Sequence, residues 1–485
     1  MPVTAPSLSP QPWHKALAQP ASEFANTPLP VISGRIPKGL RGTFYQNGTG
    51  RLQRGGEPVG HWFDGDGAIL RVAIGGDAQG GSATGTYRYV QTDGYQRESE
   101  ADKFLYGNYG MRYPGPIWAH VAGLFNGATL KNSANTSVLA LADRLLALWE
   151  GGNPHSLDLE TLQTFGKESL GWLKPTQPFS AHPLQDPLTG EIYSIGVNYK
   201  CDLAIYRCDR ACNLIKQSVI ALKDVPLVHS FVMAGPYLVF LISPVKVDVL
   251  PLLLNQKSYA DALKWQSDRG TRIIVVDRQS LEVISQSFAE SWFQWHFGNG
   301  CVDADGNVRL DFVRFDDFTH INEVLREIPT GQVDSSADGS LWQLRLNPKT
   351  GQVLNSECVL ERDCEFPQVK AAQRGQPWRY TYLLLHRSGI SAAQDWFRAI
   401  GQFDYQTGRL LEHDLGEGHY GSEPLYVADR LNLERGWLIE VVYSALADRS
   451  ELWIFDAQRL DPVCKLALPG VVPLGFHGTW QTAKD

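Results

Sequence analysis

Six residues that could take part in metal chemistry open short segments of similar character along this sequence. The segments are SAH, VHS, WHF, CEF, SEP and FHG, and the residues are His182, His229, His296, Glu365, Glu423 and His477. A single histidine beside aromatic residues is usually a hydrogen-bonded core residue, but four of the 12 histidines at matching positions suggest a common site. Neutral imidazoles are costly to bury without partners, whereas together they can ligate a metal cation. If the fold brings the four histidines together, we therefore expect a metal site.

The elements that must position these residues are β-strands. Short alternating segments such as IYSIGV, YLVFLI, RIIVVD and TYLLLH fill the chain, and Gly, Asp and Pro bound them. Segments of this kind are typical of strands. Between the segments, NPKTGQV and DYQTGRL are typical of hairpin turns, in which glycine supplies the positive φ. The sequence therefore predicts an all-β protein.

The predicted strands recur in units of about four. Six units end in the same way, with a strand, an Asp or Asn, a glycine-type turn and a further strand. An N-terminal unit from GTFYQNGTG to TYRYVQTDG makes a seventh, and GFHGTWQ is expected to be a final strand that closes against it. Repeated four-stranded units predict a seven-bladed β-propeller, in which radial repetition protects the sheet edges.

A propeller would bring the candidate ligands together, because the innermost strand of each blade lines the central axis. Residues at the same position of different blades then converge, and the four histidines would meet near this axis. A ligating imidazole usually donates its other N–H group to a carboxylate. The candidate carboxylates are Glu365 and Glu423, with Glu150 of LLALWEGG as a third. Other histidines do not share the position: His320, His386, His413 and His419.

The repeats predict that residues 1–485 form a single domain. We expect its propeller core to span about residues 36–480. We expect residues 1–35 to form an N-terminal extension. Segments 100–130 and 245–268 are predicted to form a helical and loop cap at the entrance to the axial site.

Composition and charge exclude several functional classes. The net charge of −8, without a run of Lys or Arg, argues against a nucleic-acid surface. The seven cysteines form no Cys-x-x-Cys pair, which fits a reducing cytosol. The N-terminus has no apolar signal segment, and the most apolar stretch, 225–254, contains prolines and charges that argue against a spanning helix. We expect a soluble cytoplasmic protein with no obligate protein partner.

The sequence resembles the carotenoid cleavage oxygenases from about Ile36 to Trp480. The resemblance rests on motifs in the family's order: GTFYQNGTG, HWFDGDGA, LKNSANT, RLLALWEGGNPH, SAHP, WHFGNG, CEFP, SEPLYV and FHGTW. It implies a seven-bladed propeller with one Fe²⁺ on its axis, held by the four histidines. It also implies that the three glutamates bond the ligating imidazoles. The implied reaction inserts O₂ across a C=C bond of an apocarotenoid, at the central 15-15' position, and gives two carbonyl products such as retinal.

Three functions remain open at this point. The first is an apocarotenoid-cleaving dioxygenase, and the second is a stilbene- or phenylpropanoid-cleaving dioxygenase of the same fold. Lys131 and Tyr95 lie in segments that flank the family's substrate channel and could anchor a phenol, although Lys131 could equally be structural. Trp118 and Phe125 are further candidates for the channel wall. The third function is a propeller that binds a carotenoid or a protein partner without catalysis.

Two apolar segments could bring a polyene out of a membrane. One is 116–130, and the other is 247–265, whose leucines are dense for a loop. We expect them to form a patch that dips into one leaflet, as monotopic helices do, and thus a peripheral membrane contact. Both segments could instead belong to the core. The residues of the predicted patch are Leu250, Leu252, Leu253 and Leu254.

Overall fold

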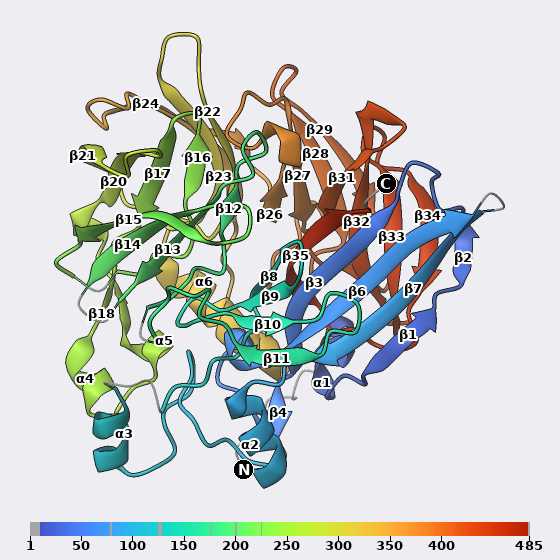
Figure 1. Cartoon of the computed structure of the whole chain (residues 1–485), viewed down its shortest axis with the longest axis horizontal. Helices are drawn as coiled ribbons and strands as arrows, with labels where there is room; N and C mark the ends of the chain where they lie inside the picture. The colour runs from blue at the N-terminus through green and yellow to red at the C-terminus, as the bar shows by residue number, and fades with distance from the viewer. Residues whose placement is uncertain are drawn as a thin grey trace, which may run out of the picture.

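Strands arranged around a centre dominate the structure, a computed structural model that describes residues 10–77, 80–124, 129–175, 177–198, 201–224 and 226–483. Within these residues the strands form six sheets of four or more strands, and Figure 1 shows the sheets fanning out side by side. The architecture is an all-β, propeller-like fold, as the repeats predicted. Two further sheets have only two strands each. One pairs β4 (Gln53–Arg54) with β5 (Glu57–Pro58), and the other pairs β18 (Val245–Val247) with β19 (Leu263–Trp265).

The two ends of the chain meet in one five-stranded sheet, in the order β1-β7-β6-β3-β35. Its strands are β1 (Phe24–Pro28), β3 (Gly42–Arg51), β6 (Asp66–Asp77), β7 (Gly80–Tyr89) and β35 (Gly475–Thr482). β35 runs antiparallel to β3, with Phe44 opposite Trp480. The final strand therefore closes against the N-terminal unit, which confirms the prediction for GFHGTWQ.

Two four-stranded sheets follow along the chain, each in sequence order. The first consists of β8 (Ser137–Ala140), β9 (Leu145–Leu148), β10 (His155–Leu157) and β11 (Thr164–Lys167). The second consists of β12 (Leu184–Gln185), β13 (Ile192–Val197), β14 (Asp202–Cys208) and β15 (Leu214–Ala221). Neighbouring strands in both sheets are antiparallel hairpins, so each sheet is one local repeat unit.

The next sheet has eight strands, in the order β21-β20-β17-β16-β22-β23-β24-β25. One half contains β16 (Val232–Ala234), β17 (Tyr237–Ile242), β20 (Thr271–Asp277) and β21 (Val283–Ala289). The other half contains β22 (Phe297–Val302), β23 (Val308–Arg314), β24 (Ser340–Leu346) and β25 (Val353–Leu360). A single parallel pair, Ala234 with Gly300, joins the halves. Because of this bridge, the number of hydrogen-bonded sheets is lower than the seven predicted blades.

Two more sheets complete the fold. A four-stranded sheet contains β26 (Cys364–Gln368), β27 (Tyr380–Leu385), β28 (Ala399–Asp404) and β29 (Arg409–Asp414). A six-stranded sheet contains β2 (Val31–Gly34), β30 (His419–Gly421), β31 (Leu425–Asp429), β32 (Asn432–Ser444), β33 (Arg449–Asp456) and β34 (Pro462–Ala467). Within residues 1–35, which were expected to form an N-terminal extension, β1 and β2 add outer strands to two sheets.

The middle parts of several strands are apolar and buried where neighbouring sheets pack face to face. In β20, four consecutive residues from Ile273 to Val276 are fully buried. Side chains of β13 and β14, such as Tyr193 and Ile205, pack in one cluster with Phe231 and Phe240 of the next unit. These inner strands therefore have two buried faces, which favours continuous apolar runs over strict alternation, whereas outer strands such as β29 are largely exposed.

Short helices lie outside the sheets. They are α1 (Lys15–Ala18), α2 (Asp93–Ala101), α3 (Ile117–Leu124), α4 (Val249–Leu253), α5 (Tyr259–Ala262) and α6 (Phe318–Glu327). Single 3₁₀ turns are η1 (Pro12–His14), η2 (Trp62–Asp64), η3 (Ser267–Arg269), η4 (Ile328–Thr330) and η5 (Ala371–Gln373). Figure 1 shows α3, α4 and α5 grouped at the lower left, on one side of the sheets. Among the described residues, no helix is both long enough and apolar enough to cross a bilayer.

Helix α6 supplies a wall for the site described below. The Asp317 side chain accepts a hydrogen bond from the backbone N–H of His320, which caps the helix at its start. One face of the helix is buried, including Ile321, Val324 and Leu325, and this spacing follows the helical period. The opposite face, with the exposed His320, points to solvent.

Candidate metal centre

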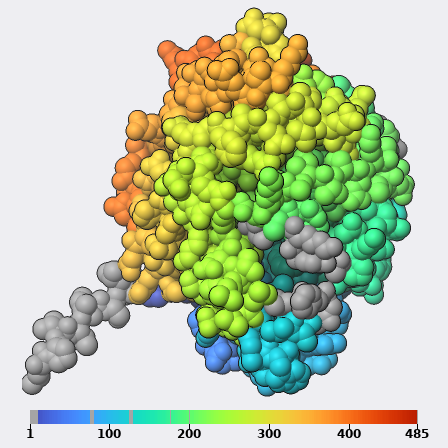
Figure 2. Space-filling view, turned by 90° about the vertical axis from the view of Figure 1, so that its left-hand side faces the viewer, coloured from blue at the N-terminus to red at the C-terminus, as the bar shows by residue number. Residues whose placement is uncertain are grey.

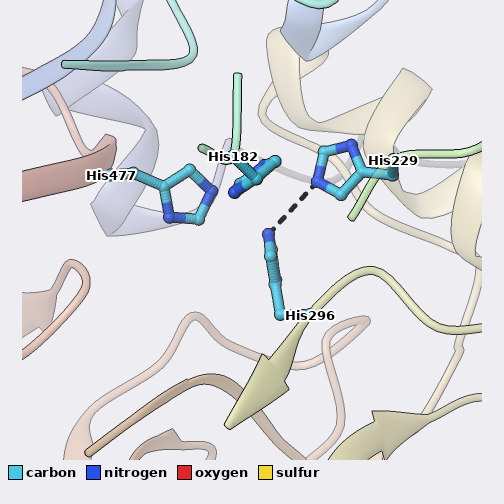
Figure 3. Close-up of side chains that lie close together, drawn as sticks. All are labelled: His182, His229, His296 and His477. Atoms are coloured by element: carbon cyan, nitrogen blue, oxygen red, sulfur yellow. Dashed lines mark hydrogen bonds between the residues drawn. The ribbon is translucent and has the colours of Figure 1, made fainter. Parts of the chain in front are cut away.

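The four histidines at matching repeat positions meet at one point in the structure. Each can offer a ring nitrogen such that the four nitrogens lie within 4.8 Å of one another. Figure 3 shows the four rings directed toward a common centre, with 3.3 Å between Nε2 of His229 and Nε2 of His296. His182 precedes β12, His229 precedes β16, His296 directly precedes β22 and His477 lies within β35. The convergence predicted from the repeats is therefore present.

The electrostatics of this cluster fit a cation. Burial lowers the pKa of His182 well below its ordinary value, and the three neighbouring histidines lower it further. Its Nε2 atom is buried and has no hydrogen-bond partner. A neutral imidazole with an unpartnered buried nitrogen is costly unless a ligand accepts its lone pair. Together the four converging imidazole nitrogens form a donor set that suits a divalent transition metal.

Three carboxylates contact the Nδ1 atoms of three of the imidazole rings. Oε2 of Glu365 lies 2.6 Å from Nδ1 of His296, and Oε1 of Glu423 lies 2.9 Å from Nδ1 of His477. Glu150 contacts Nδ1 of His229. A carboxylate that accepts an N–H bond from Nδ1 leaves the Nε2 lone pair free to face the centre. The three glutamates proposed from the sequence thus occupy the positions that would orient the ligating rings.

Glu423 is itself fixed by further hydrogen bonds. The Nε2 atom of Gln368 donates to its Oε1 at 2.7 Å, and the backbone N–H of Gly478 donates to its Oε2 at 2.8 Å. Glu423 is buried, so these donors compensate for the loss of water. The position of the His477 ring therefore depends on a network that extends beyond the glutamate.

An apolar cavity of about 630 Å³ reaches this cluster. Its wall includes three of the histidines, together with Glu150 and Glu365. Near them the wall is aromatic, and Phe366 stacks on His296 with ring centroids 5.4 Å apart. The other aromatic residues of the wall are Trp13, Trp62, Phe63, Tyr109, Trp149, Tyr259, Trp295, Phe315, Trp396, Phe397 and Phe476. Such a cavity would accept a long apolar molecule and exclude water from the histidines.

One end of the cavity lies beside α4. Leu252 and Leu253 line this end, and Leu250, Leu253 and Leu254 are exposed to solvent. The neighbouring helix α3 is held to α4 by a hydrogen bond of 3.0 Å between Nε2 of His120 and the Leu252 carbonyl oxygen. Figure 2 shows this face of the molecule, which is hollowed beside the yellow-green segment that contains α4.

Three residues proposed for the substrate channel are not among those that line this cavity. The Lys131 ammonium lies 2.6 Å from Asp66 and 2.7 Å from Glu98 in a buried ion cluster, because Glu98 of α2 packs against it. Tyr95 stacks on Tyr89. Trp118 is 74% exposed, and none of the three lines the cavity. Phe125 lies outside the described residues.

Several wall residues were missed in the sequence. Ile321, Val324 and Leu325 of α6 line the cavity, and their apolar spacing at i, i+3 and i+4 is a signal that could have identified this helix. His386 and Asp363 also line the cavity. They come from separate loops, and no spacing in the sequence links them.

The comparisons with known proteins agree with this geometry. The sequence model of the family described as retinal pigment epithelial membrane protein matches residues 17–482. The apocarotenoid-15,15'-oxygenase of Synechocystis sp. is 30% identical over 490 residues, which cover 98% of this chain and 97% of that protein. Resveratrol cleavage oxygenase 1 of Aspergillus fumigatus is 24% identical, covering 94% of this chain and 92% of that protein.

A solved structure gives the same result for the fold. The crystal structure of cobalt-substituted apocarotenoid oxygenase from Synechocystis superposes with a TM-score of 0.88 and 29% sequence identity. The match covers 98% of this chain and 99% of that chain. With a matching family model, a matching fold and four converging histidines, the chain belongs to the carotenoid cleavage oxygenase family.

Proposed function

We propose that this protein is an iron-dependent dioxygenase that cleaves a C=C bond of an apocarotenoid with O₂. The carbon–carbon double bond breaks, and each of its two carbons receives one oxygen atom, so that the products are two carbonyl compounds such as retinal. The observation that carries the proposal is the meeting of four imidazole nitrogens within 4.8 Å in an apolar cavity. The name of the Synechocystis relative supports the apocarotenoid as substrate and the 15-15' bond as its point of cleavage.

The metal would be held by His182, His229, His296 and His477. The geometry and neutral charge of these ligands fit Fe²⁺, and the cobalt substitution of the Synechocystis structure supports a transition metal. When bound, ferrous iron supplies the redox chemistry that activates dioxygen. Glu150, Glu365 and Glu423 would keep three of the ligand rings in the tautomer that presents Nε2 to the metal.

The remaining work of the protein is positioning and the exclusion of water. The reaction needs no protein nucleophile, and the wall near the histidines is largely aromatic. Phe366 lies against both His296 and His477, with ring centroids 5.4 Å from each, so a polyene that slides along it would pass the metal. Fixing one double bond beside the metal lowers the entropic part of the barrier.

A stilbene substrate is the second candidate, because a relative is named resveratrol cleavage oxygenase. The case for a phenol anchor rested on Lys131 and Tyr95. Asp66 and Glu98 already neutralise the Lys131 ammonium, and Tyr95 packs against Tyr89. We therefore favour the apocarotenoid.

The test is to incubate iron-loaded protein in air with an apocarotenal and, separately, with resveratrol, and to identify the aldehydes by mass spectrometry. Two carbonyl products from the apocarotenal, with label from ¹⁸O₂ in both, are expected. Cleavage of resveratrol alone would replace the substrate assignment. Binding of the apocarotenal without any product would favour a carotenoid-binding propeller instead.

We also propose that the propeller has seven blades in one domain, with α3 to α6 as its cap. The eight-stranded sheet would count as two blades, since only the pair Ala234 and Gly300 bridges its halves. Each half has the four antiparallel strands of a repeat unit. The exposed leucines of α4, near the cavity, would contact a membrane from its aqueous side and admit the polyene.

A further inference from the structure

Strand β26 reaches two of the four ligand imidazoles at once. Its residue Glu365 contacts Nδ1 of His296 at 2.6 Å. Three residues later, Nε2 of Gln368 donates to Oε1 of Glu423 at 2.7 Å. The same oxygen of Glu423 lies 2.9 Å from Nδ1 of His477. The strand therefore acts on one imidazole through a carboxylate, and on the other through an amide and a carboxylate.

A β-bulge explains how one strand can make both contacts. Successive side chains of a regular strand point to opposite faces, so residues three apart, such as Glu365 and Gln368, would lie on different faces. The pairing of β26 with β27 shifts between these two residues. There Phe366 and Pro367 lie opposite the single residue Leu383, which is the pattern of a bulge. The extra residue resets the alternation, so that both polar side chains reach toward the histidines.

The bulge holds its first residue in an unusual backbone conformation. Phe366 has a φ of +53°, in the left-handed region that residues other than glycine seldom adopt. Its backbone N–H donates to Oε2 of Glu365, the oxygen that also contacts His296. Pro367 has no N–H group, which suits a position without a regular partner across the sheet. A conformation of this kind persists where the surrounding contacts fix it, and it is concentrated at functional sites.

The ring of Phe366 links the two imidazoles further. Its centroid lies 5.4 Å from that of His296 and 5.4 Å from that of His477. Figure 3 shows that these two imidazoles face the same centre. The bulge therefore presents three groups to this pair of ligands, namely the Glu365 carboxylate, the Phe366 ring and the Gln368 amide.

The amide of Gln368 fixes the direction in which Glu423 faces. Oε1 of Glu423 lies within hydrogen-bond distance of both Gln368 and His477, while Oε2 accepts from the backbone N–H of Gly478 at 2.8 Å. Hydrogen bonds to a carboxylate are stronger than those between neutral groups. Without the amide, Oε1 would have the imidazole as its remaining donor, and the carboxylate would be freer to rotate. The His477 ring would then lose part of its orientation.

We propose that Gln368 is a positioning residue of the metal centre, and that the bulge of β26 makes it act jointly with Glu365. Gln368 would orient His477 through Glu423, as Glu365 orients His296 directly. This inference rests on the metal site of the proposed function and not on its substrate. Loss of a partner behind a ligand weakens metal binding by about 10- to 100-fold. We expect the lower end, about tenfold, for Gln368, because it acts one step further from the metal.

The first test measures metal binding by Gln368→Met, which removes the amide and keeps the length of the side chain. Full-length, metal-free protein is titrated with Co²⁺ in the absence of dioxygen and in competition with a chelator, and the visible absorption of the bound cobalt is recorded. We expect about tenfold weaker binding. We also expect a shifted cobalt spectrum, because a rotated imidazole changes the ligand field, whereas a general loss of stability would not.

Gln402→Met is the matched control. Gln402 is a buried glutamine of β28 in the same sheet, and its Nε2 donates to the Ala457 carbonyl oxygen at 2.6 Å, outside the network of the histidines. This variant should bind Co²⁺ with the affinity and spectrum of the unmodified protein. Gln368→Leu is a second variant in case the thioether disturbs the packing. A folded Gln368 variant with unchanged affinity and spectrum would overturn the positioning role.

The second test is a double-mutant cycle of Gln368→Met and Glu365→Gln. If the bulge makes the two residues act jointly, the loss of affinity in the double variant should be smaller than the product of the two single losses. Single losses that multiply would overturn the joint action. A protein that binds no Co²⁺ even when unmodified would contradict the metal site and this inference together. Because the assay needs no turnover, the expected binding results without any cleavage would contradict only the dioxygenase proposal.

Discussion

At the scale of the residue, the metal centre shows which functional groups a sequence can reveal. The four histidines and three glutamates were identifiable because a propeller places equal positions of successive units around one axis. His386 shares no such position, and its meeting with Asp363 depends on how two loops pack. The ion pairs of Lys131 could not be predicted for a related reason, since its partners Asp66 and Glu98 come from distant segments.

Replacing one ligand tests the centre directly. We expect His296→Ala to reduce bound iron from one ion per chain and to lower activity by at least about a hundredfold, because a metal site loses affinity even when only an outer partner is removed. The loss should appear as iron content, measured by atomic absorption, as well as activity. His413→Ala is the control, since His413 lies on the outer strand β29, away from the cluster. Full iron content in His296→Ala would be incompatible with the proposed ligand set.

At the scale of the element, local patterns identified strands well and the cavity wall poorly. Continuous apolar segments such as that of β20 specified strands buried on both faces, and the hairpin turns fixed their order. The short turn η2 was not predicted, although it carries Trp62 and Phe63 into the cavity. A three-residue turn has no period to detect, so its contribution depends on its neighbours.

The buried carboxyl group of η2 should make stability depend on pH. Burial raises the pKa of Asp64 from 3.8 to about 7, although hydrogen bonds from the Gly110 backbone N–H oppose this rise. The folded state then retains a proton that the unfolded state releases above pH 4. The contribution of Asp64 is therefore most favourable at low pH and is lost as the pH rises through about 7.

Asp64→Asn should remove this dependence, because an amide does not titrate and can still accept the Gly110 bond. Urea unfolding midpoints of metal-free protein between pH 4.5 and 8 would measure it. As the pH rises, the free energy of unfolding of the variant should increase relative to that of the unmodified protein. The increase should be a few kcal/mol at most, because each pKa unit corresponds to about 1.4 kcal/mol. Parallel curves for the two proteins would show that Asp64 is not the source of the dependence.

At the scale of the whole molecule, repetition in the sequence predicted the architecture, and the chain ends complete it. β35 pairs with β3 across more than 400 residues of sequence, so His477 reaches the centre only when the ring closes. The outer strands β1 and β2 escaped prediction because they have no hairpin partner next to them in sequence. Metal binding and closure of the propeller are therefore expected to depend on each other.

The outer surface carries the last prediction, which concerns the membrane. Leu250, Leu253 and Leu254 are exposed on α4, beside the end of the cavity that Leu252 and Leu253 line. Changing these three exposed leucines to serine should lower binding to phospholipid vesicles by at least about tenfold, because burying each leucine contributes up to 1.5–3 kcal/mol. Flotation of the protein with vesicles would measure the change.

A control variant can match this one in number and chemistry. Leu431, Leu433 and Leu446 are at least as exposed but lie in the six-stranded sheet region, and none of them lines the cavity. Changing them to serine should leave vesicle binding unchanged, since the proposed contact depends on position rather than on total exposed apolar area. Cleavage of a substrate delivered in detergent should be equal in both variants, whereas cleavage of a substrate delivered in vesicles should fall only in the α4 variant. Equal vesicle binding by the two variants would mean that α4 does not form the membrane contact, and the route of the polyene into the cavity would have to begin elsewhere.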